Sequence, residues 1–269
     1  MLAEVDIRQV QSSMAQCANG MDAFLALPGT PGPHPSIVLL HERYGLAQHT
    51  KDLATRFASE GSVCIAPNLF FREPNQDEIL RGDANGHHTD DSVSEDVAAA
   101  IDRLALVAEA NTDRIAVMGV CATGRYPLVV AARRSDVDAC LVFYGGTPRT
   151  DDGREPLLDV VKRSRAPVLG VFGELDHVDS IENVRAFRDC MEEARRSYVI
   201  KMFAAVPHGF LNDTMPGRYR RGEAEAAWQL LRDFMKRVRS GGFPTDRVQW
   251  SWESDISTEY DYSKHVRME

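Results

Sequence analysis

Residues 114–126 read Arg114-Ile-Ala-Val-Met-Gly-Val-Cys-Ala-Thr-Gly-Arg-Tyr126. The apolar run from Ile115 to Met118 predicts a buried strand, and the small, apolar residues from Pro127 to Ala132 predict a helix just beyond it. A strand, a tight turn and a helix therefore follow one another, with Cys121 at the turn.

The cysteine in this turn is a candidate nucleophile. Such a nucleophile elbow pushes one side chain out beyond the sheet, and its neighbours must be small because the strand and helix backbones nearly touch. Gly119 and Gly124 leave that space, whereas Thr123 stands where a second glycine would fit more easily. The alternative is that Cys121 is a small buried apolar residue, as free cysteines often are.

Length and composition limit the classes of protein. The chain has 269 residues, 43% of them hydrophobic, which is enough for one large core in an α/β domain. The net charge of −9, without a basic stripe, argues against nucleic-acid binding. The five cysteines are odd in number, scattered and without CxxC spacing, so we expect no disulfide framework and no zinc cluster. We also expect no other metal and no cofactor.

The N-terminal residues Met1 to Arg8 lack a positive region followed by an apolar core. No apolar run in the sequence approaches the length of a membrane span. We therefore expect a cytoplasmic protein that does not bind membranes, in a setting that keeps a reactive thiol reduced.

Apolar strands alternate with amphipathic helices along the chain. The predicted strands are an outer strand at 21–28, then 37–40, 62–67, 115–118, 138–144, 166–173 and a last strand at 198–203. The predicted helices are 51–59, 92–110 with a capping box at Ser92 and Glu95, 127–132, 180–196 and 220–239. Polar residues 75–91 are predicted to form a long loop or an irregular insert. The alternation predicts a mostly parallel sheet with helices on both faces.

The sequence changes character after Gly242. Aromatic and apolar residues there alternate with polar ones, at Val248, Trp250, Trp252, Tyr260 and Tyr262. This pattern predicts an extended arm. We expect one domain over residues 1–240 and a C-terminal aromatic extension over 241–269. The arm either packs on its own domain or clasps a second subunit in a homodimer.

Four predicted strand ends carry polar residues, namely Glu42, Cys121, Asp176 and His208. The ends of parallel strands lie along one edge of the sheet, where ligands bind. The order nucleophile, acid, histidine is that of α/β-hydrolases. His208 can accept the thiol proton and Asp176 can hold the imidazole in the required tautomer. Alternatively, His208 is an ordinary loop residue and Asp176 caps a turn.

Acyl transfer also requires hydrogen-bond donors for the oxyanion that develops on the substrate. The backbone N–H of Ala122 follows the candidate nucleophile directly and is one such donor. The backbone N–H of Arg43, after the first polar strand end, is the other candidate.

Five motifs resemble the dienelactone hydrolase (carboxymethylenebutenolidase) family of the α/β-hydrolase superfamily, over residues 20–240. They are His41-Glu-Arg-Tyr-Gly45, Ala66-Pro-Asn-Leu-Phe-Phe-Arg72, Gly119-Val-Cys-Ala-Thr-Gly-Arg125, Gly173-Glu-Leu-Asp176 and His208-Gly-Phe210. The resemblance implies an α/β-hydrolase fold and the metal-free hydrolysis of a lactone ester bond through a thioester intermediate. It also implies Cys121, Asp176 and His208 as the triad, with Glu42 holding the thiol until an anionic substrate displaces it.

The resemblance further implies residues that bind the substrate. Arg72 matches an arginine that binds the substrate carboxylate, and Tyr44 is a second candidate for substrate binding. The chain departs from the family at Thr123, where a glycine is usual. It also has Leu211 and Asn212 where a second carboxylate-binding arginine is expected.

The leading hypothesis is a cysteine-dependent enzyme that hydrolyses a lactone or ester of a small compound, which can be anionic. This lactone or ester is the expected small-molecule partner of the protein. Two alternatives are a carboxylesterase of broad specificity and a non-catalytic sensor that keeps the pocket. A third is a glutamine amidotransferase-like protein with a cysteine elbow. The positions of Asp176 and His208 late in the chain argue against this third alternative.

Overall fold

The computed structural model describes residues 10–148 and 153–258. They fall into two compact units, and the boundary between Met118 and Gly119 lies inside strand β5 (Ala110–Val120). Residues 1–8, Tyr260 and Tyr262, which carried expectations above, lie outside the described residues. The predicted division into residues 1–240 and 241–269 stays a prediction.

The first unit contains a mixed sheet. Its strands lie side by side in the order β1 (Gln11–Gln16), β2 (Asp22–Leu27), β4 (Val63–Pro67) and β3 (His34–Leu40). The β1–β2 and β2–β4 pairs are antiparallel and the β3–β4 pair is parallel. The strand predicted at 21–28 is confirmed as β2, but its predicted outer position was wrong, because β1 lies outside it. The mostly exposed, polar sequence of β1 gave no strand pattern.

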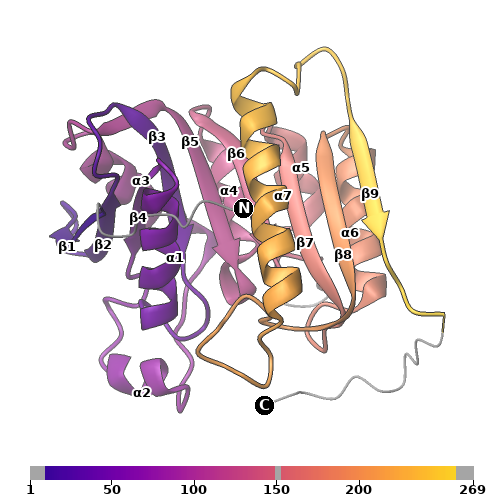
Figure 1. Ribbon diagram of the computed structural model, residues 1–269, viewed down its shortest axis with the longest axis horizontal. Helices are drawn as coiled ribbons and strands as arrows, with labels where there is room; N and C mark the ends of the chain where they lie inside the picture. Colours follow the sequence, from indigo (N-terminus) through magenta and orange to yellow (C-terminus); the bar gives the residue numbers. More distant parts are fainter. Residues whose placement is uncertain (1–9, 149–152, 259–269) are drawn as a thin grey trace. The chain divides into compact units, whose positions relative to one another are not determined.

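Helices cover both faces of this sheet, with α1 (Gln48–Ser59) on one face and α3 (Asp90–Leu104) on the other (Figure 1). The predicted start of the second helix was wrong. Thr89 is the N-cap, and its hydroxyl accepts the N–H of Ser92 at 3.1 Å. The predicted end at residue 110 was also wrong, because β5 begins there. Residues 75–91 include helix α2 (Gln76–Arg81), so they are not all loop.

The second unit contains a parallel sheet in the order β6 (Val137–Phe143), β7 (Val168–Leu175), β8 (Tyr198–Pro207) and β9 (Trp250–Ser254). Helix α7 (Arg221–Arg239) covers one face, and α4 (Tyr126–Arg133), α5 (Leu157–Arg163) and α6 (Ile181–Glu193) cover the other (Figure 1). Large side chains from these elements are fully buried, including Phe143, Phe172, Phe187, Tyr198 and Trp228. The predicted mostly parallel sheet with helices on both faces is confirmed.

The C-terminal arm packs on its own unit. Strand β9 pairs in parallel with β8, so the prediction that 198–203 is the last strand was wrong. The indole N–H of Trp250 donates to the carbonyl of Arg196 at 2.9 Å, and the Arg188 guanidinium lies 5.1 Å from the Trp252 ring centroid. Residues 250–254 therefore pack on their own domain, which was the first of the two predicted alternatives. The homodimer stays a prediction.

Candidate active site

The turn after β5 has the backbone of a nucleophile elbow. Cys121 has a φ of +57°, in the left-handed region, and begins a short 3₁₀ helix, η2 (Cys121–Thr123), that leads into α4. A Cβ at Gly119 would lie 2.3 Å from the carbonyl oxygen of Thr123, and one at Gly124 would lie 2.6 Å from Gly145. Both positions therefore require glycine, and the predicted strand, tight turn and helix are confirmed.

Thr123 closes this turn with its side chain. It is fully buried. Its hydroxyl accepts the N–H of Val120 at 3.0 Å and donates to the carbonyl of Val120 at 3.1 Å. Thr123 is not among the residues with a positive φ, so its backbone does not require glycine. The Thr123 side chain, where the family usually has glycine, thus links η2 to the end of β5.

Three candidate catalytic side chains form a continuous chain of contacts. His208 Nε2 lies 3.0 Å from Cys121 Sγ. His208 Nδ1 lies 2.8 Å and 3.0 Å from the two carboxylate oxygens of Asp176. Asp176 directly follows β7 and His208 directly follows β8, and both are buried, whereas Cys121 is partly exposed. Residues that are 87 positions apart in the sequence thus meet beside the elbow.

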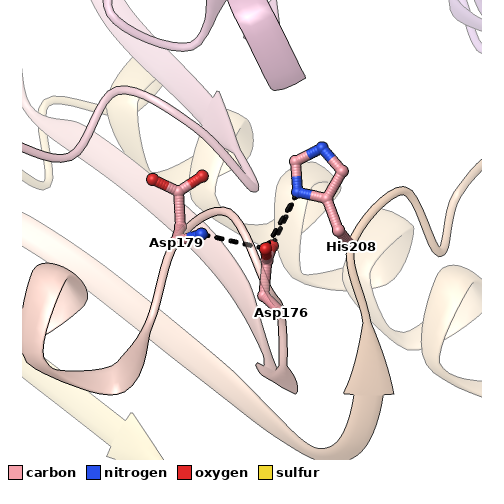
Figure 2. A group of neighbouring side chains, drawn as sticks. All are labelled: Asp176, Asp179 and His208. Atoms are coloured by element: carbon pink, nitrogen blue, oxygen red, sulfur yellow. Dashed lines mark hydrogen bonds and ion pairs between the residues drawn. The ribbon is translucent and has the colours of Figure 1, made fainter. Parts of the chain in front are cut away.

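The carboxylate of Asp176 is held by main-chain donors. Its Oδ1 accepts the N–H of Val178 at 2.7 Å and the N–H of Asp179 at 2.9 Å. Figure 2 shows this carboxylate between Asp179 and the imidazole of His208. The Asp179 carboxylate in turn accepts the hydroxyl of Thr147, in the segment after β6. The acid is therefore aimed at His208 by the fold of its own loop.

Asp176, Asp179 and His208 also form a group of potential metal ligands. One donor atom of each lies within 4.8 Å of the others. His208 Nδ1, however, already contacts Asp176 at 2.8 Å, and its Nε2 faces the sulfur. The group therefore fits a hydrogen-bonded carboxylate and imidazole, in which Asp176 orients the ring.

The charge of His208 follows from these neighbours. Burial lowers the pKa of His208, but Cys121 and Asp176 outweigh burial and hold this pKa well above its ordinary value. The raised pKa favours the charged imidazolium, which donates from both nitrogens. An imidazolium beside a sulfur favours the thiolate, the nucleophilic form of cysteine. The arrangement can thus attack a carbonyl carbon and then supply a proton.

Aromatic rings enclose His208. The Tyr144 ring is fully buried and meets the imidazole edge-on at 5.2 Å, and the ring of His177 lies 5.7 Å away. A Cβ at Gly145 would lie 2.1 Å from the carbonyl oxygen of Cys121, so this segment packs directly against the elbow. The sequence analysis did not select Tyr144 or His177, although each lies at the end of a predicted strand.

Ala122 lies where an oxyanion donor is expected. It follows Cys121 in the first turn of η2 and is exposed. The first N–H groups of a helix have no partner within the helix, so they can bind an anion. The other candidate donor, Arg43, belongs to the first unit.

In the first unit, Glu42, Arg43 and Tyr44 follow β3 in a segment fixed by local contacts. Glu42 is buried. The preceding His41 donates from Nδ1 to the Glu42 carbonyl at 2.7 Å and accepts the N–H of Leu69 on Nε2 at 3.0 Å. Burial lowers the pKa of His41 to about 4, so this imidazole is neutral at physiological pH.

The side chains of Arg43 and Tyr44 contact each other and their own unit. The guanidinium of Arg43 donates to the Gly82 carbonyl at 3.1 Å and lies 5.3 Å from the Tyr44 ring centroid. A Cβ at Gly82 would lie 2.9 Å from the Tyr44 ring. Gly82 ends α2, so these contacts join the segment after β3 to the region that was predicted as a loop.

Arg72 has an internal partner. Its two terminal nitrogens donate to the two carboxylate oxygens of Asp96, each at 2.9 Å, and its guanidinium lies 4.1 Å from the Phe71 ring centroid. The Asp96 side chain is 1% exposed, whereas that of Arg72 is 51% exposed. The sequence did not reveal this ion pair, because Asp96 lies 24 residues away on α3. Substrate binding by Arg72 stays a prediction.

The residues after His208 also differ from the expected pattern. Leu211 and Asn212 are buried, and the Asn212 carboxamide oxygen accepts the N–H and hydroxyl of Thr214. Arg218 approaches from later in the same segment. A Cβ at Gly209 would lie 3.4 Å from Arg218 Cδ. A guanidinium thus lies near the histidine loop, at a position in the sequence that the family pattern did not indicate.

The chain is similar in sequence to known proteins. A carboxymethylenebutenolidase, so named provisionally, from Escherichia coli O157:H7 is 30% identical over 234 residues, which cover 84% of this chain and 85% of that protein. Another with the same provisional name, from Methylorubrum extorquens, is 26% identical over 221 residues, which cover 80% of this chain and 76% of that protein.

Solved structures show the same fold. A provisionally named dienelactone hydrolase from Klebsiella pneumoniae has a TM-score of 0.72 at 22% identity, over 87% of this chain and 98% of that chain. A dienelactone hydrolase-like promiscuous phosphotriesterase from metagenomic libraries has a TM-score of 0.71 at 19% identity, over 86% and 99%. The chain has the α/β-hydrolase fold. Residues 21–239 match the model of the dienelactone hydrolase family, and the chain belongs to this family.

Proposed function

We propose that this protein hydrolyses a lactone or ester of a small compound through a thioester formed on Cys121. Hydrolysis of an ester or lactone bond is the reaction class of the family to which the chain belongs. The observation that carries the finer proposal is the 3.0 Å contact between His208 Nε2 and Cys121 Sγ, with Asp176 on the other ring nitrogen.

Acylation begins from the thiolate and imidazolium pair. Cys121 Sγ attacks the carbonyl carbon of the substrate and forms a tetrahedral intermediate. The negative charge that develops on the carbonyl oxygen is stabilised by the N–H of Ala122, with that of Arg43 as the second proposed donor. The C–O bond to the alcohol then breaks. The leaving oxygen takes the Nε2 proton of His208, which leaves a thioester and a neutral imidazole.

Deacylation reverses these roles. The neutral His208 takes a proton from water, which attacks the thioester carbonyl and forms a second tetrahedral intermediate. This intermediate expels the thiolate, and His208 is again charged beside it. Asp176 holds the ring throughout, because its carboxylate accepts from Nδ1 at 2.8 Å. In a lactone, acid and alcohol belong to one molecule, so ring opening adds one water and releases one hydroxy acid.

The residues proposed to select the substrate are basic or carry a hydroxyl. Arg72 and Tyr44 are the expected substrate-binding residues, and Arg218 adds a guanidinium near Gly209. These side chains favour a small substrate with a carboxylate. Glu42 is the proposed partner of the thiol before such a substrate arrives. We further propose a cytoplasmic setting, which keeps Cys121 reduced. In residues 10–148 and 153–258, no helix combines the length and apolar character needed to cross a membrane.

A panel of aryl esters and small lactones tests this function. We expect turnover by the wild type and a loss of about 10³-fold or more in kcat for Cys121→Ala and His208→Ala. Cys190→Ala is the matched control, because Cys190 lies on α6 and is also partly exposed. A thioester trapped on Cys121 and identified by mass spectrometry would support the covalent step.

The same experiment separates the alternatives. Full activity in Cys121→Ala or His208→Ala would rule out the proposed chemistry. Rapid alkylation of Cys121 with no turnover of any ester would favour a non-catalytic sensor. Equal turnover of neutral and anionic esters would favour a carboxylesterase of broad specificity.

A further inference from the structure

Strand β8, which His208 directly follows, is irregular just before the histidine. On β7, Gly173 pairs with Phe203 and Leu175 pairs with Pro207. One residue, Glu174, separates these two pairs on β7, whereas three residues, 204–206, separate them on β8. Strand β8 therefore bulges at 204–206, directly before Pro207 and His208. Such bulges re-aim the side chains that follow them.

The end of β7 is built to receive this bulge. A Cβ at Gly173 would lie 2.2 Å from the carbonyl oxygen of Val206, so a side chain there would displace the bulge. Ala205, at the centre of the bulge, has a φ of +56°. Its N–H donates to the carboxylate Oε2 of Glu174 at 2.6 Å. Glu174 thus supplies the acceptor for the bulged residue.

The other oxygen of Glu174 reaches the C-terminal arm. Oε1 accepts the N–H of Ser257, three residues after β9 ends. Between them, the N–H of Asp255 donates to the carbonyl of Met202 at 3.1 Å, and Lys201 Nζ lies 2.7 Å from the Asp255 carboxylate. The arm therefore continues along β8 as far as the bulge. Glu174 is 1% exposed and joins the two segments from inside the unit.

We propose that Glu174 is a positioning residue for His208 and that the C-terminal arm is part of its support. The carboxylate holds the bulge on one oxygen and the arm on the other. The same end of β7 then provides Asp176, which holds the imidazole itself. The arm lies beyond residue 239, where the match to the family ends. This inference rests on the proposed function, since it assigns the support of the same catalytic histidine.

The physical argument is one of distance along the chain. Val206 and Pro207 alone separate the bulged Ala205 from His208, so a movement of the bulge is transmitted to the imidazole. A misplacement of about 1 Å in a catalytic group can lower the rate about 100-fold. A buried carboxylate that accepts two N–H groups makes charge-assisted hydrogen bonds, which are stronger than neutral ones. The Glu174 carboxylate is therefore well suited to hold the bulged segment of β8, which departs from regular pairing with β7.

The variant Glu174→Gln tests the carboxylate. Glutamine has almost the same size, but its Nε2 is a donor and cannot accept the second N–H, so one of the two main-chain donors loses its partner. We expect kcat to fall about 10-fold or more with KM unchanged. We also expect slower alkylation of Cys121 by iodoacetamide and a shift in the pH titration of His208 followed by NMR.

The variant Ser257→Pro tests the arm, with Ser257→Ala as its matched control. Proline removes the N–H that Glu174 accepts, whereas alanine removes the hydroxyl and keeps the N–H. We expect Ser257→Pro to reproduce part of the Glu174→Gln effect and Ser257→Ala to resemble the wild type. Because the arm lies at the edge of the sheet, this pair provides the test if Glu174→Gln does not fold.

The outcomes separate positioning from stability alone. A Glu174→Gln protein with a lower Tm but with the kcat, alkylation rate and His208 titration of the wild type would overturn the proposal. Identical behaviour of Ser257→Pro and Ser257→Ala would show that the C-terminal arm does not help to position His208. If the wild type hydrolyses no ester, the proposed function fails by itself. The alkylation rate and the NMR titration still decide whether Glu174 positions the imidazole.

Discussion

Two buried histidines follow strands in this protein, and their surroundings shift their pKa values in opposite directions. His41 follows β3 in the first unit, and its ring nitrogens contact the Glu42 carbonyl and the Leu69 N–H. His208 follows β8 in the second unit and lies between a sulfur and a carboxylate. Burial lowers the pKa of His41 to about 4, whereas Cys121 and Asp176 outweigh burial and raise that of His208.

The comparison shows what makes a strand-end residue reactive. Both histidines are buried, so burial does not distinguish them. His41 uses its nitrogens to fix main-chain segments, which suits a structural role. His208 contacts two side chains that can carry negative charge, so its proton can move during a reaction. The identity of the hydrogen-bond partners, more than the position in the fold, separates the two roles.

The largest expected effect comes from making His208 resemble His41. Asp176→Asn removes the negative charge that faces Nδ1 of His208, so the pKa of His208 falls and the ring loses its proton at lower pH. We expect kcat to drop about 10²- to 10⁴-fold. The alkaline limb of its pH profile should move to lower pH, as measured on an aryl ester. An unchanged alkaline limb would contradict the contribution of Asp176 to the charge of His208.

The stability of the fold should also depend on pH with opposite signs at the two histidines. The charged form of His208 contributes stability that is fully present below its unfolded pKa of about 6.5 and is lost as pH rises through its raised folded pKa. The depressed pKa of His41 has the reverse consequence. Its contribution is present above about pH 6.5 and is lost as pH falls towards 4.

The lowered pKa of His41 should reduce the free energy of unfolding by about 3 kcal/mol between about pH 6.5 and pH 4. His41→Gln should remove this part of the acid dependence of the unfolding free energy, measured by urea denaturation from pH 7 to pH 4. His87→Gln is the matched control, because the His87 side chain is 86% exposed. The same acid dependence in His41→Gln and the wild type would show that His41 is not the source.

The sequence predicted the parts of the fold that depend on local patterns. Burial of the strand before Cys121 and of one face of the helix before Gly241 is recorded in the spacing of their apolar residues. These two elements can therefore be recognised without the structure. The order of Cys121, Asp176 and His208 predicted three residues that the structure brings into contact. Strand β1 lies at a sheet edge, where exposure weakens the pattern, and the sequence analysis did not predict it. The alternation around Trp250 and Trp252 predicted an extended arm, but not its pairing with β8 as the edge strand β9.

The supporting contacts could not be predicted in this way. Glu174 lies 31 residues from Ala205 and 83 from Ser257, and its partners are main-chain N–H groups that any residue could provide. A bulge likewise depends on the register between two strands, which the sequence of one strand does not specify. Thr123 was recognised as a departure from the family, but its bonds to Val120 required the coordinates.

The smallest expected effect concerns Arg72, where the first unit offers two roles for one side chain. Arg72 pairs with Asp96, and it is also the expected anchor for a substrate carboxylate. Arg72→Ala leaves the buried Asp96 carboxylate without this partner, although solvent screens the half-exposed guanidinium. We expect a loss of about 1 to 2 kcal/mol in unfolding free energy. Arg81→Ala, which breaks the exposed pair with Asp83, should cost less than about 0.5 kcal/mol.

The kinetics of the same variant decide between the two roles. If Arg72 also binds the substrate, KM for an ester with a carboxylate should rise about 10-fold, while KM for its neutral analogue stays the same. Arg72→Lys should recover little of this loss, because an ammonium cannot pair with a carboxylate through two parallel N–H bonds. If Arg72→Ala leaves the KM of both esters unchanged from the wild type, Arg72 has a role like that of His41, a polar side chain that supports the fold.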